Sequence, residues 1–192
     1  PLGVREVLVG PSVVDDAAAR PGGAMALVLD MLRDRGVAVR TLRAGDSLAL
    51  GDARIDVLSP LDSDALESAN DRSLVLLVTA PTDDGPRRVL LTGDVQKDAM
   101  RALLSRHPDL PADILEAPHH GSAHDDAQAF VRRVDPRVVV QSTGPSRLND
   151  PRWNEIRATR TWLTTASDGA IGVTVRRDGS IDTRTVLGEA DR

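Results

Sequence analysis

The chain has 192 residues, 41% of them hydrophobic, which is enough for a single domain with its own core. The formal net charge of −5 argues against a protein that holds long nucleic acid on a basic face. Without cysteine, the chain has no disulfides, thiolate ligands or cysteine nucleophile, so a metal would be held by His nitrogen or carboxylate oxygen. The apolar runs are strand-sized, which predicts no membrane span within these residues.

The hydrophobic pattern predicts one α/β domain over residues 1–192, rich in antiparallel strands with helices outside. The first half favours strands at 4–9, 37–42, 47–50, 54–58, 74–79 and 87–91, with one helix at 22–36. The second half favours helices at 96–107, from 125 or 126 to 134, and at 153–160. Strands are expected at 114–115 and 137–141, followed by a terminal β run. The chain begins at Pro1, and we expect it to be a fragment.

Two short loops are the strongest functional signal. Leu91-Thr92-Gly93-Asp94 and Pro118-His119-His120-Gly121-Ser122 each follow a predicted strand, so both can present ligands at one sheet edge. A lone Gly-Asp is more often a turn residue, but adjacent histidines between proline and glycine are poorly explained by packing. In an extended loop the two rings point in opposite directions, so we expect one histidine to bind a metal and the other to orient it or contact substrate.

Other polar residues have simpler alternative explanations. Ser122 lacks a nucleophile-elbow pattern, which favours a role as hydroxyl donor or helix cap. Asn70 to Ser73 either caps a loop or reaches the same edge as Asp94. His124 is expected on a loop surface, and His107 near the end of a helix.

Taken in order, these elements resemble the metallo-β-lactamase-fold domain of ComEC-type competence proteins, which take DNA into bacterial cells. The resemblance rests on Leu90 to Val95, Ala112 to Ser122 and Asn70 to Leu77, and extends over 44–46, 57–60, 144, 149–151 and 167–171. It implies an αββα sandwich with a metal site at one edge. It also implies single-stranded DNA and a membrane-channel domain of the same polypeptide as partners, with the full-length protein in the bacterial cytoplasmic membrane.

The family resemblance implies roles for individual residues. Asp94 would bridge two divalent ions, zinc or manganese, and His119 or His120 would be a ligand. Asp94 and His120 are the expected catalytic residues. Ser122, Asn70 and Ser73 are the expected substrate contacts.

The chain departs from the family pattern in two places. No His-x-His-x-Asp-His-like cluster is present, and Asp150-Pro151 stands where the family has His-Pro. An aspartate suits Mn²⁺ or Mg²⁺ better than it replaces imidazole for zinc, so Asp150 indicates either an altered metal preference or a decayed site.

Three functions remain open on the sequence. The leading hypothesis is the C-terminal part of a phosphodiesterase or nuclease domain, inactive as this fragment. The first alternative is a degenerate, non-catalytic module for docking or guiding DNA. The second is a soluble hydrolase of another ester or lactone, because fold alone does not choose a substrate.

Overall fold

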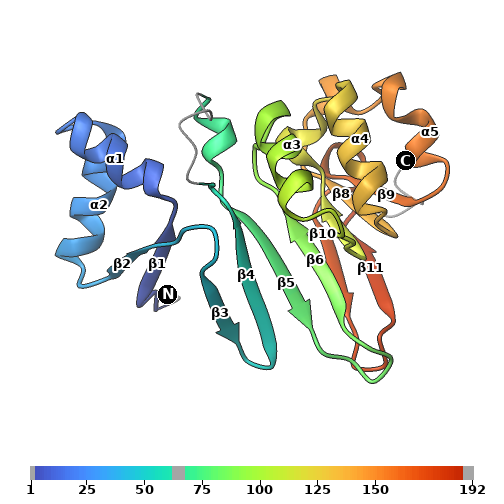
Figure 1. Ribbon diagram of the computed structural model, residues 1–192, viewed down its shortest axis with the longest axis horizontal. Coiled ribbons are helices and arrows are strands. Elements are labelled where there is room, and N and C mark those ends of the chain that lie inside the picture. Colours follow the sequence, from blue (N-terminus) through green and yellow to red (C-terminus); the bar gives the residue numbers. More distant parts are fainter. Residues whose placement is uncertain (1–2, 62–67, 188–192) are drawn as a thin grey trace.

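The computed structural model describes residues 3–61 and 68–187. Its centre is a seven-stranded sheet in the order β3-β4-β5-β6-β7-β8-β9, antiparallel from β3 to β6 and parallel from β6 to β9 (Figure 1). The strands are β3 Ser47–Leu50, β4 Ala53–Ser59, β5 Val75–Ala80, β6 Arg87–Leu91, β7 Ile114–Glu116, β8 Val138–Gln141 and β9 Thr161–Thr164. Because β6, β7 and β8 run parallel, the loops after them open at the same end of the sheet.

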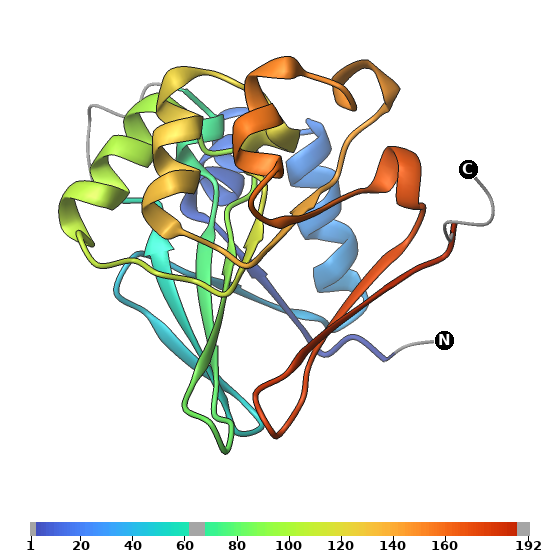
Figure 2. The same ribbon diagram turned by 90° about the vertical axis from the view of Figure 1, so that its right-hand side faces the viewer.

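One face of this sheet is covered by helices α3 (Lys97–Arg106) and α4 (Asp125–Val134), as Figure 2 shows. Their apolar sides bury Met100, Leu103 and Phe130 against Leu90 and Leu115 of the sheet. Helix α4 has a well-separated apolar side, because its buried residues Ala127, Phe130, Val131 and Val134 lie on one face of the helix. This core anchors β6 and β7, the two strands that lead into the predicted site.

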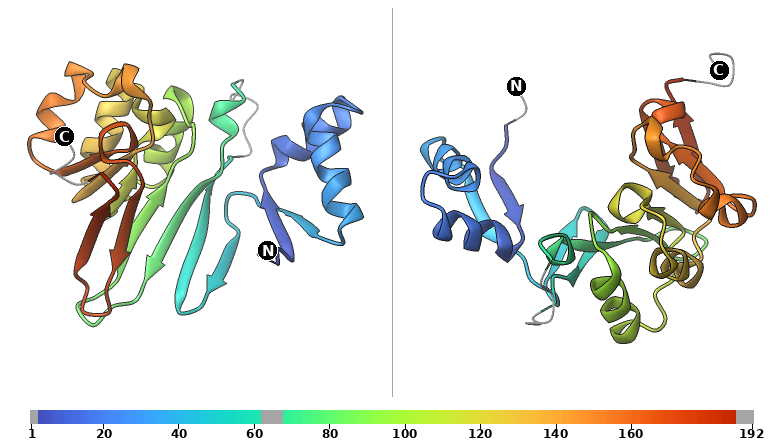
Figure 3. Two further views of the ribbon diagram at one scale, coloured as in Figure 1. Left: turned by 180° about the vertical axis from the view of Figure 1, so that it is seen from behind. Right: turned by 90° about the horizontal axis from the view of Figure 1, so that it is seen from above.

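The other side of the sheet carries two small sheets. One is the parallel pair β1 (Glu6–Val9) and β2 (Ala38–Thr41), which packs with α1 (Pro11–Ala19) and α2 (Ala24–Asp34). The other is the hairpin β10 (Ile171–Val175) and β11 (Ile181–Thr185). Seen from above in Figure 3, the β1–β2 unit and the hairpin lie at opposite ends of this side. The structure is thus a mixed α/β fold, as expected from the sequence, with a large central sheet, helices α3 and α4 on one face and two small sheets on the other side.

The second side is only partly covered. Neither α1 nor α2 contains a buried residue, and Leu27, Val28 and Met31 of α2 are all exposed. Leu8 of β1 and Val39 of β2 are exposed as well. An apolar surface of this kind is unusual for a finished domain and marks a place where further chain or a partner can pack.

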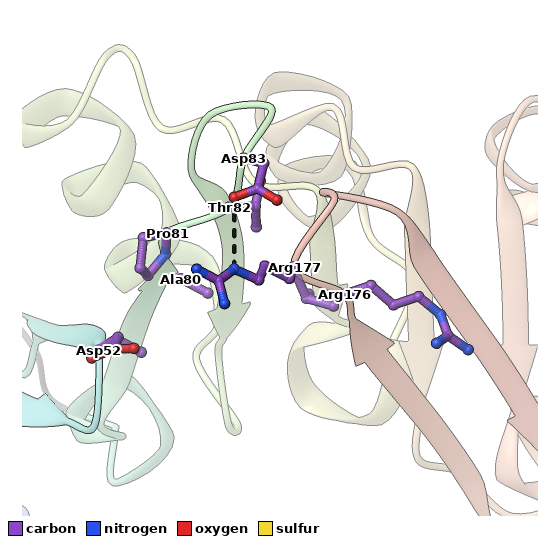
Figure 4. Close-up of a pocket in the computed structure, with 9 residues that line it drawn as sticks. Asp52, Ala80, Pro81, Thr82, Asp83, Arg176 and Arg177 are labelled. Carbon is purple, nitrogen blue, oxygen red and sulfur yellow. Dashed lines mark ion pairs between the residues drawn. The ribbon is translucent and has the colours of Figure 1, made fainter.

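A hollow of about 520 Å³ lies where the tip of the β10–β11 hairpin meets the turn between β5 and β6. Figure 4 shows Arg177 reaching Asp83 across it, with Nε 3.7 Å from the carboxylate. Since β6 runs away from this turn toward Leu91, the hollow is at the end of the sheet opposite the predicted site. It takes no part in the chemistry considered below.

Most predicted elements are confirmed, including the strands expected at 74–79 and 87–91, which pair as an antiparallel hairpin, and the strand expected at 137–141. Helix α1 was not predicted, because Gly10-Pro11 reads as a turn although proline is favourable at the first helical position. The helix expected at 153–160 is shorter, with a 3₁₀ turn at Pro151–Trp153 leading into α5 (Asn154–Arg157). In the described ranges, no helix is both long and apolar enough to cross a membrane.

Candidate functional site

Asp94 lies in a tight turn directly after β6. Gly93 has φ +54°, a left-handed conformation that glycine adopts without cost, and a Cβ here would lie 3.3 Å from Cβ of Ser73. Glu116 at the end of β7 holds the turn, because its Oε2 accepts hydrogen bonds from the backbone N–H groups of Thr92 and Gly93, both at 3.0 Å. The neighbouring strand thus fixes the direction in which Asp94 leaves the sheet.

The two loops singled out in the sequence come together. The backbone N–H of His119 donates to the carbonyl of Gly93 at 3.0 Å. Nε2 of His120 lies 3.3 Å from Oδ1 of Asp94, and the two side chains are 54% and 43% exposed. The structure therefore places a carboxylate and an imidazole side by side at an open edge of the sheet, where a substrate can reach them.

The histidine loop is not extended, and that expectation was wrong. His119 (φ 47°, ψ 49°) and His120 (φ 57°, ψ 26°) both adopt the left-handed conformation, and Gly121 follows with φ +74°. Two successive non-glycine residues in this region are uncommon, and each costs on the order of 1–3 kcal/mol. The two rings are tilted by 48° with centroids 6.4 Å apart, so they diverge without pointing in opposite directions.

Three donors from later in the chain hold this turn, one on each carbonyl. The His119 carbonyl accepts from Nη1 of Arg147 at 2.9 Å, and the His120 carbonyl accepts from Nε2 of Gln141 at 3.2 Å. The carbonyl of the next residue accepts from the indole Nε1 of Trp153 at 2.9 Å. Because every carbonyl of the turn is fixed, the backbone strain is compensated and the His120 ring is held in one place.

Position 121 requires glycine because of the side chain packed against it as well as because of its left-handed φ. A Cβ at this position would lie 2.3 Å from Nε2 of Gln141, closer than any real contact. Gln141 is fully buried, and its Oε1 accepts from Trp162 Nε1 and Arg157 Nη2, both at 2.9 Å. The amide therefore has no room to move, and the glycine allows it to reach the histidine loop.

The hydrogen bonds of His120 indicate where its ring proton lies. Nδ1 is 2.9 Å from the carbonyl oxygen of Ser142, which can only accept, so Nδ1 carries the proton. In the neutral ring Nε2 then presents a lone pair toward the carboxylate of Asp94. Two acceptors facing each other at this separation are stable only with a proton or a cation between them. An imidazole anchored through Nδ1–H to a carbonyl is the usual arrangement of a metal-binding histidine.

The residues expected to contact substrate lie around this pair. Ser73 contacts the Gly93 turn, directly after the 3₁₀ turn Asn70–Arg72. This segment is tied to the site by Asp71, which is 5% exposed and accepts from the backbone N–H of Gln96 at 3.0 Å. Ser122 is half-buried just after the histidine turn. Substrate binding by Asn70, Ser73 and Ser122 remains a prediction.

Asp150 is held by Arg152. Its carboxylate caps the following 3₁₀ turn by accepting from the Arg152 backbone N–H at 3.1 Å, and it also accepts from Nε at 3.0 Å and Nη2 at 2.7 Å. The hydrogen bonds from Arg152 lower the pKa of Asp150. A metal role for Asp150 remains a prediction, and it would require the Arg152 side chain to be displaced.

His124 lies in the loop directly before α4, as expected, but it is half-buried and caps the helix. Its Nδ1 accepts the backbone N–H of Ala127 at 3.2 Å, the role that the sequence suggested for Asp125 or Asp126. Burial lowers the pKa of His124, since desolvation disfavours the charged ring. His107 is the residue at which α3 ends, as predicted.

The donor set fits one side of a metal site. Asp94 offers carboxylate oxygen and His120 offers imidazole nitrogen, both suited to Zn²⁺ or Mn²⁺. Within residues 3–61 and 68–187, however, no group of three or more His, Asp or Glu side chains is arranged to hold an ion. Since such sites need three or more protein ligands, these two donors alone are insufficient.

Sequence reasoning missed the residues that support the pair. They are Glu116, Gln141, Arg147 and Trp153, which lie on separate elements and up to 34 positions from the histidines. Glu116 alone carried a local signal, since it is a charged residue at the end of a buried strand. Gln141, Arg147 and Trp153 donate hydrogen bonds to backbone carbonyls, and such contacts have no recognisable sequence motif.

No family model matches the chain. It is 33% identical over 117 residues to ComE operon protein 3 of Bacillus subtilis, which covers 61% of this chain and 14% of that protein. It is 34% identical over 85 residues to the uncharacterized protein YcaI of Escherichia coli, covering 44% of this chain and 11% of that protein. The resemblance to ComEC-type proteins is thus confirmed, and the chain spans only a small part of each relative.

Solved structures give weaker matches. The metallo-β-lactamase fold protein YhfI from Bacillus subtilis matches with a TM-score of 0.40 at 8% identity, over 80% of this chain and 61% of that one. CmlA, a diiron β-hydroxylase from Streptomyces venezuelae, matches with a TM-score of 0.35 at 16% identity, over 58% of this chain and 26% of that one. The α/β class is established by the sheet and helices described above.

Proposed function

We propose that this chain forms part of a metal-dependent hydrolase domain that cleaves phosphodiester bonds in DNA during uptake of DNA into the cell. The observation that carries the proposal is the pairing of Asp94 with His120 at 3.3 Å on a strained, fully anchored loop. Residues held in costly conformations cluster at functional sites, where the surrounding structure over-determines them. The similarity to ComE operon protein 3 supports the choice of DNA as substrate.

In this proposal Asp94 and His120 hold one side of a divalent metal centre. A divalent ion supplies a Lewis acid and an activated water in hydrolases of this kind. The protein's part is to keep the imidazole Nε2 and the carboxylate aimed at one point, through the Ser142 carbonyl and the Glu116 carboxylate. Ser73 and Ser122 would orient the substrate with their hydroxyl groups.

We further propose that additional polypeptide completes both the metal site and the second side of the sheet. The exposed apolar side chains of β1, β2 and α2 support this, because they form a surface that a folded domain normally covers. The relatives are far longer than the matched region, which leaves room for such a segment. The channel-forming part of a membrane protein would then lie elsewhere in the same polypeptide.

A non-catalytic module is the second candidate, favoured by one observation. Asp150 stands where the family has a histidine, and its carboxylate is occupied by Arg152 in a bidentate pair. A domain that had lost its chemistry could retain the fold to dock or guide DNA. This candidate predicts DNA binding without any metal-dependent cleavage.

Cleavage of a labelled single-stranded DNA by the native polypeptide that carries this sequence tests the proposal. We expect cleavage only with added Mn²⁺ or Zn²⁺, and a loss of at least about 100-fold in Asp94→Ala, the scale on which metal ligands contribute. Asp98→Ala is the matched control, because Asp98 is an exposed carboxylate on α3 that pairs with Arg101. Undiminished cleavage by Asp94→Ala would refute the role of Asp94, and metal-independent binding alone would favour the second candidate.

A further inference from the structure

A second polar pocket lies beside His120, on the side of the ring away from Asp94. It has a volume of about 490 Å³. Apart from His120, it is lined by the loop after β8 and the start of α6 (Thr165–Asp168), namely Ser142, Thr143, Gly144, Ser146, Arg147 and Thr165. Since Nε2 of His120 faces Asp94 and Nδ1 faces the Ser142 carbonyl, the imidazole separates this pocket from the candidate metal edge.

Arg147 brings a positive charge that is not neutralised nearby. Its Nη1 donates to the His119 carbonyl, and within the described residues it forms no ion pair with a carboxylate. Arg152 and Arg160, by contrast, pair with the carboxylates of Asp150 and Asp135. Arg157 donates to the Leu148 carbonyl and the Gln141 amide oxygen and lies over the Trp162 ring. A guanidinium has five N–H donors in a planar fork, so most of those of Arg147 remain available to a ligand.

The hydroxyl groups of the pocket form two sets, one fixed by hydrogen bonds at its base and one available to a ligand at its rim. Thr165 Oγ1 accepts from the backbone N–H of Thr143 at 2.9 Å and donates to the Thr143 carbonyl at 3.1 Å, which fixes the base of the pocket. Ser142 and Ser146 are exposed, and their hydroxyls have no protein partner in the part of the chain that the structure describes. The rim therefore offers two neutral donors next to one cation.

The lining also indicates the chemistry of the ligand. No carboxylate lines the pocket, which favours an anion over a cation. Apart from the imidazole of His120 no aromatic ring lines it, so it is not built to stack a nucleobase. A cationic fork with hydroxyl donors is the set that proteins use for phosphate oxygens.

We propose that this pocket binds a backbone phosphate of single-stranded nucleic acid, adjacent to the phosphodiester presented to Asp94 and His120, with Arg147 as the principal contact. The proposal rests on the proposed function and assigns a substrate subsite to it. Binding here would fix the register of the strand across the His120 ring. Arg147 then has two roles, since the same guanidinium anchors the His119 carbonyl.

Binding without cleavage tests the subsite. The anisotropy of a fluorescein-labelled oligothymidylate is measured with the native polypeptide that carries this sequence, in EDTA at several salt concentrations. We expect Arg147→Ala to weaken binding about 10-fold, as the loss of one charge-assisted contact predicts. The salt dependence of log K should fall by about 0.7, the value for one phosphate contact to a single strand. Arg147→Lys should retain the slope, because lysine keeps the charge.

Control variants distinguish the contribution of the Arg147 charge from a general effect of losing an arginine and from an effect on folding of the histidine loop. Arg132→Ala removes an exposed arginine that is paired with Glu155, and it should leave affinity and slope unchanged. Ser146→Ala, which leaves the His119 anchor intact, should weaken binding about 3-fold, as loss of a neutral hydrogen bond predicts. Wild-type slope in Arg147→Ala, or equal losses in Arg132→Ala, would overturn the subsite.

The outcomes also distinguish this proposal from the proposed function. Binding of inorganic phosphate in calorimetry that is lost in Arg147→Ala, without any binding of the oligothymidylate, would overturn the nucleic-acid assignment and leave a site for free phosphate. Arg147-dependent binding in a polypeptide that never cleaves DNA with metal would overturn the enzyme and leave the subsite standing. Metal-dependent cleavage with unchanged affinity in Arg147→Ala would overturn the subsite alone.

Discussion

Replacing Gln141 with leucine is expected to destabilise the protein strongly, although the two side chains have similar volumes. The fully buried amide donates to the His120 carbonyl at 3.2 Å. Its oxygen accepts from Trp162 Nε1 and Arg157 Nη2, both at 2.9 Å. Leucine removes all three hydrogen bonds at once and leaves two donors and one acceptor without their partner.

The magnitude follows from the groups that lose a partner. A buried polar group left unsatisfied costs about 1–3 kcal/mol. Trp162 and Arg157 are only partly buried, so water can replace some of what is lost, and we take the lower end for each. The expected loss is therefore about 3 kcal/mol, a large fraction of the 5–15 kcal/mol typical of a domain.

Urea denaturation followed by tryptophan fluorescence measures this loss. Gln128→Leu is the control, because Gln128 is half-buried on α4 and its side chain makes no hydrogen bond among the described residues; we expect it to change stability by less than about 0.5 kcal/mol. NMR signals of the His120 ring should move in Gln141→Leu and not in the control. A loss below about 1 kcal/mol, or an unmoved His120 signal, would refute the anchoring role of Gln141.

Three further changes test the site. Gly121→Ala should cost more than about 3 kcal/mol in urea denaturation, from its left-handed φ and its clash, whereas Gly144→Ala meets nothing within 4 Å and should be nearly neutral. Glu116→Ala should cost about 2 kcal/mol by the same assay, because it leaves two backbone N–H groups of the Asp94 turn unpaired; a neutral result would contradict the role of Glu116. Because burial lowers the pKa of His124, its contribution to stability is complete above the unfolded pKa of about 6.5 and is lost as pH falls through the lower folded value. His124→Asn, which keeps a cap, should flatten thermal stability between pH 5 and 7, whereas His107→Asn should not.

The sequence predicted the meeting of the two loops because this depends on local patterns. The apolar run before Asp94 and the short strand before Pro118 both read as strands followed by turns, and β6 and β7 are parallel neighbours. Residues that follow neighbouring parallel strands emerge at the same edge of a sheet. The proximity of the Asp94 turn and the His119–His120 turn could therefore be predicted locally, whereas the roles of Asp94 and His120 were expected only from the family resemblance.

The conformation of the histidine loop was not predictable in the same way. Histidine is enriched among non-glycine residues with positive φ, but this preference is too weak to predict two in succession, and the local rule for an extended loop gave the wrong ring directions. The conformation is imposed by Gln141, Arg147 and Trp153, which reach the loop only after β8 and the following turns are in place. His124 is a different case, because the cap that it forms on α4 is a local contact with the backbone N–H of Ala127.

The way this loop is anchored bears on what the site does. A left-handed His-His pair that served only to turn the chain would be replaced at lower free energy by Asn or Gly. Here three side chains from separate elements each stabilise one carbonyl, and the Ser142 carbonyl fixes the ring through Nδ1. The result is an imidazole Nε2 held 3.3 Å from a carboxylate that Glu116 independently positions. Two acceptors brought together by rigid support on both sides are pre-organised for a proton or a cation between them, and this rigid support favours a functional site over a turn with a purely structural role.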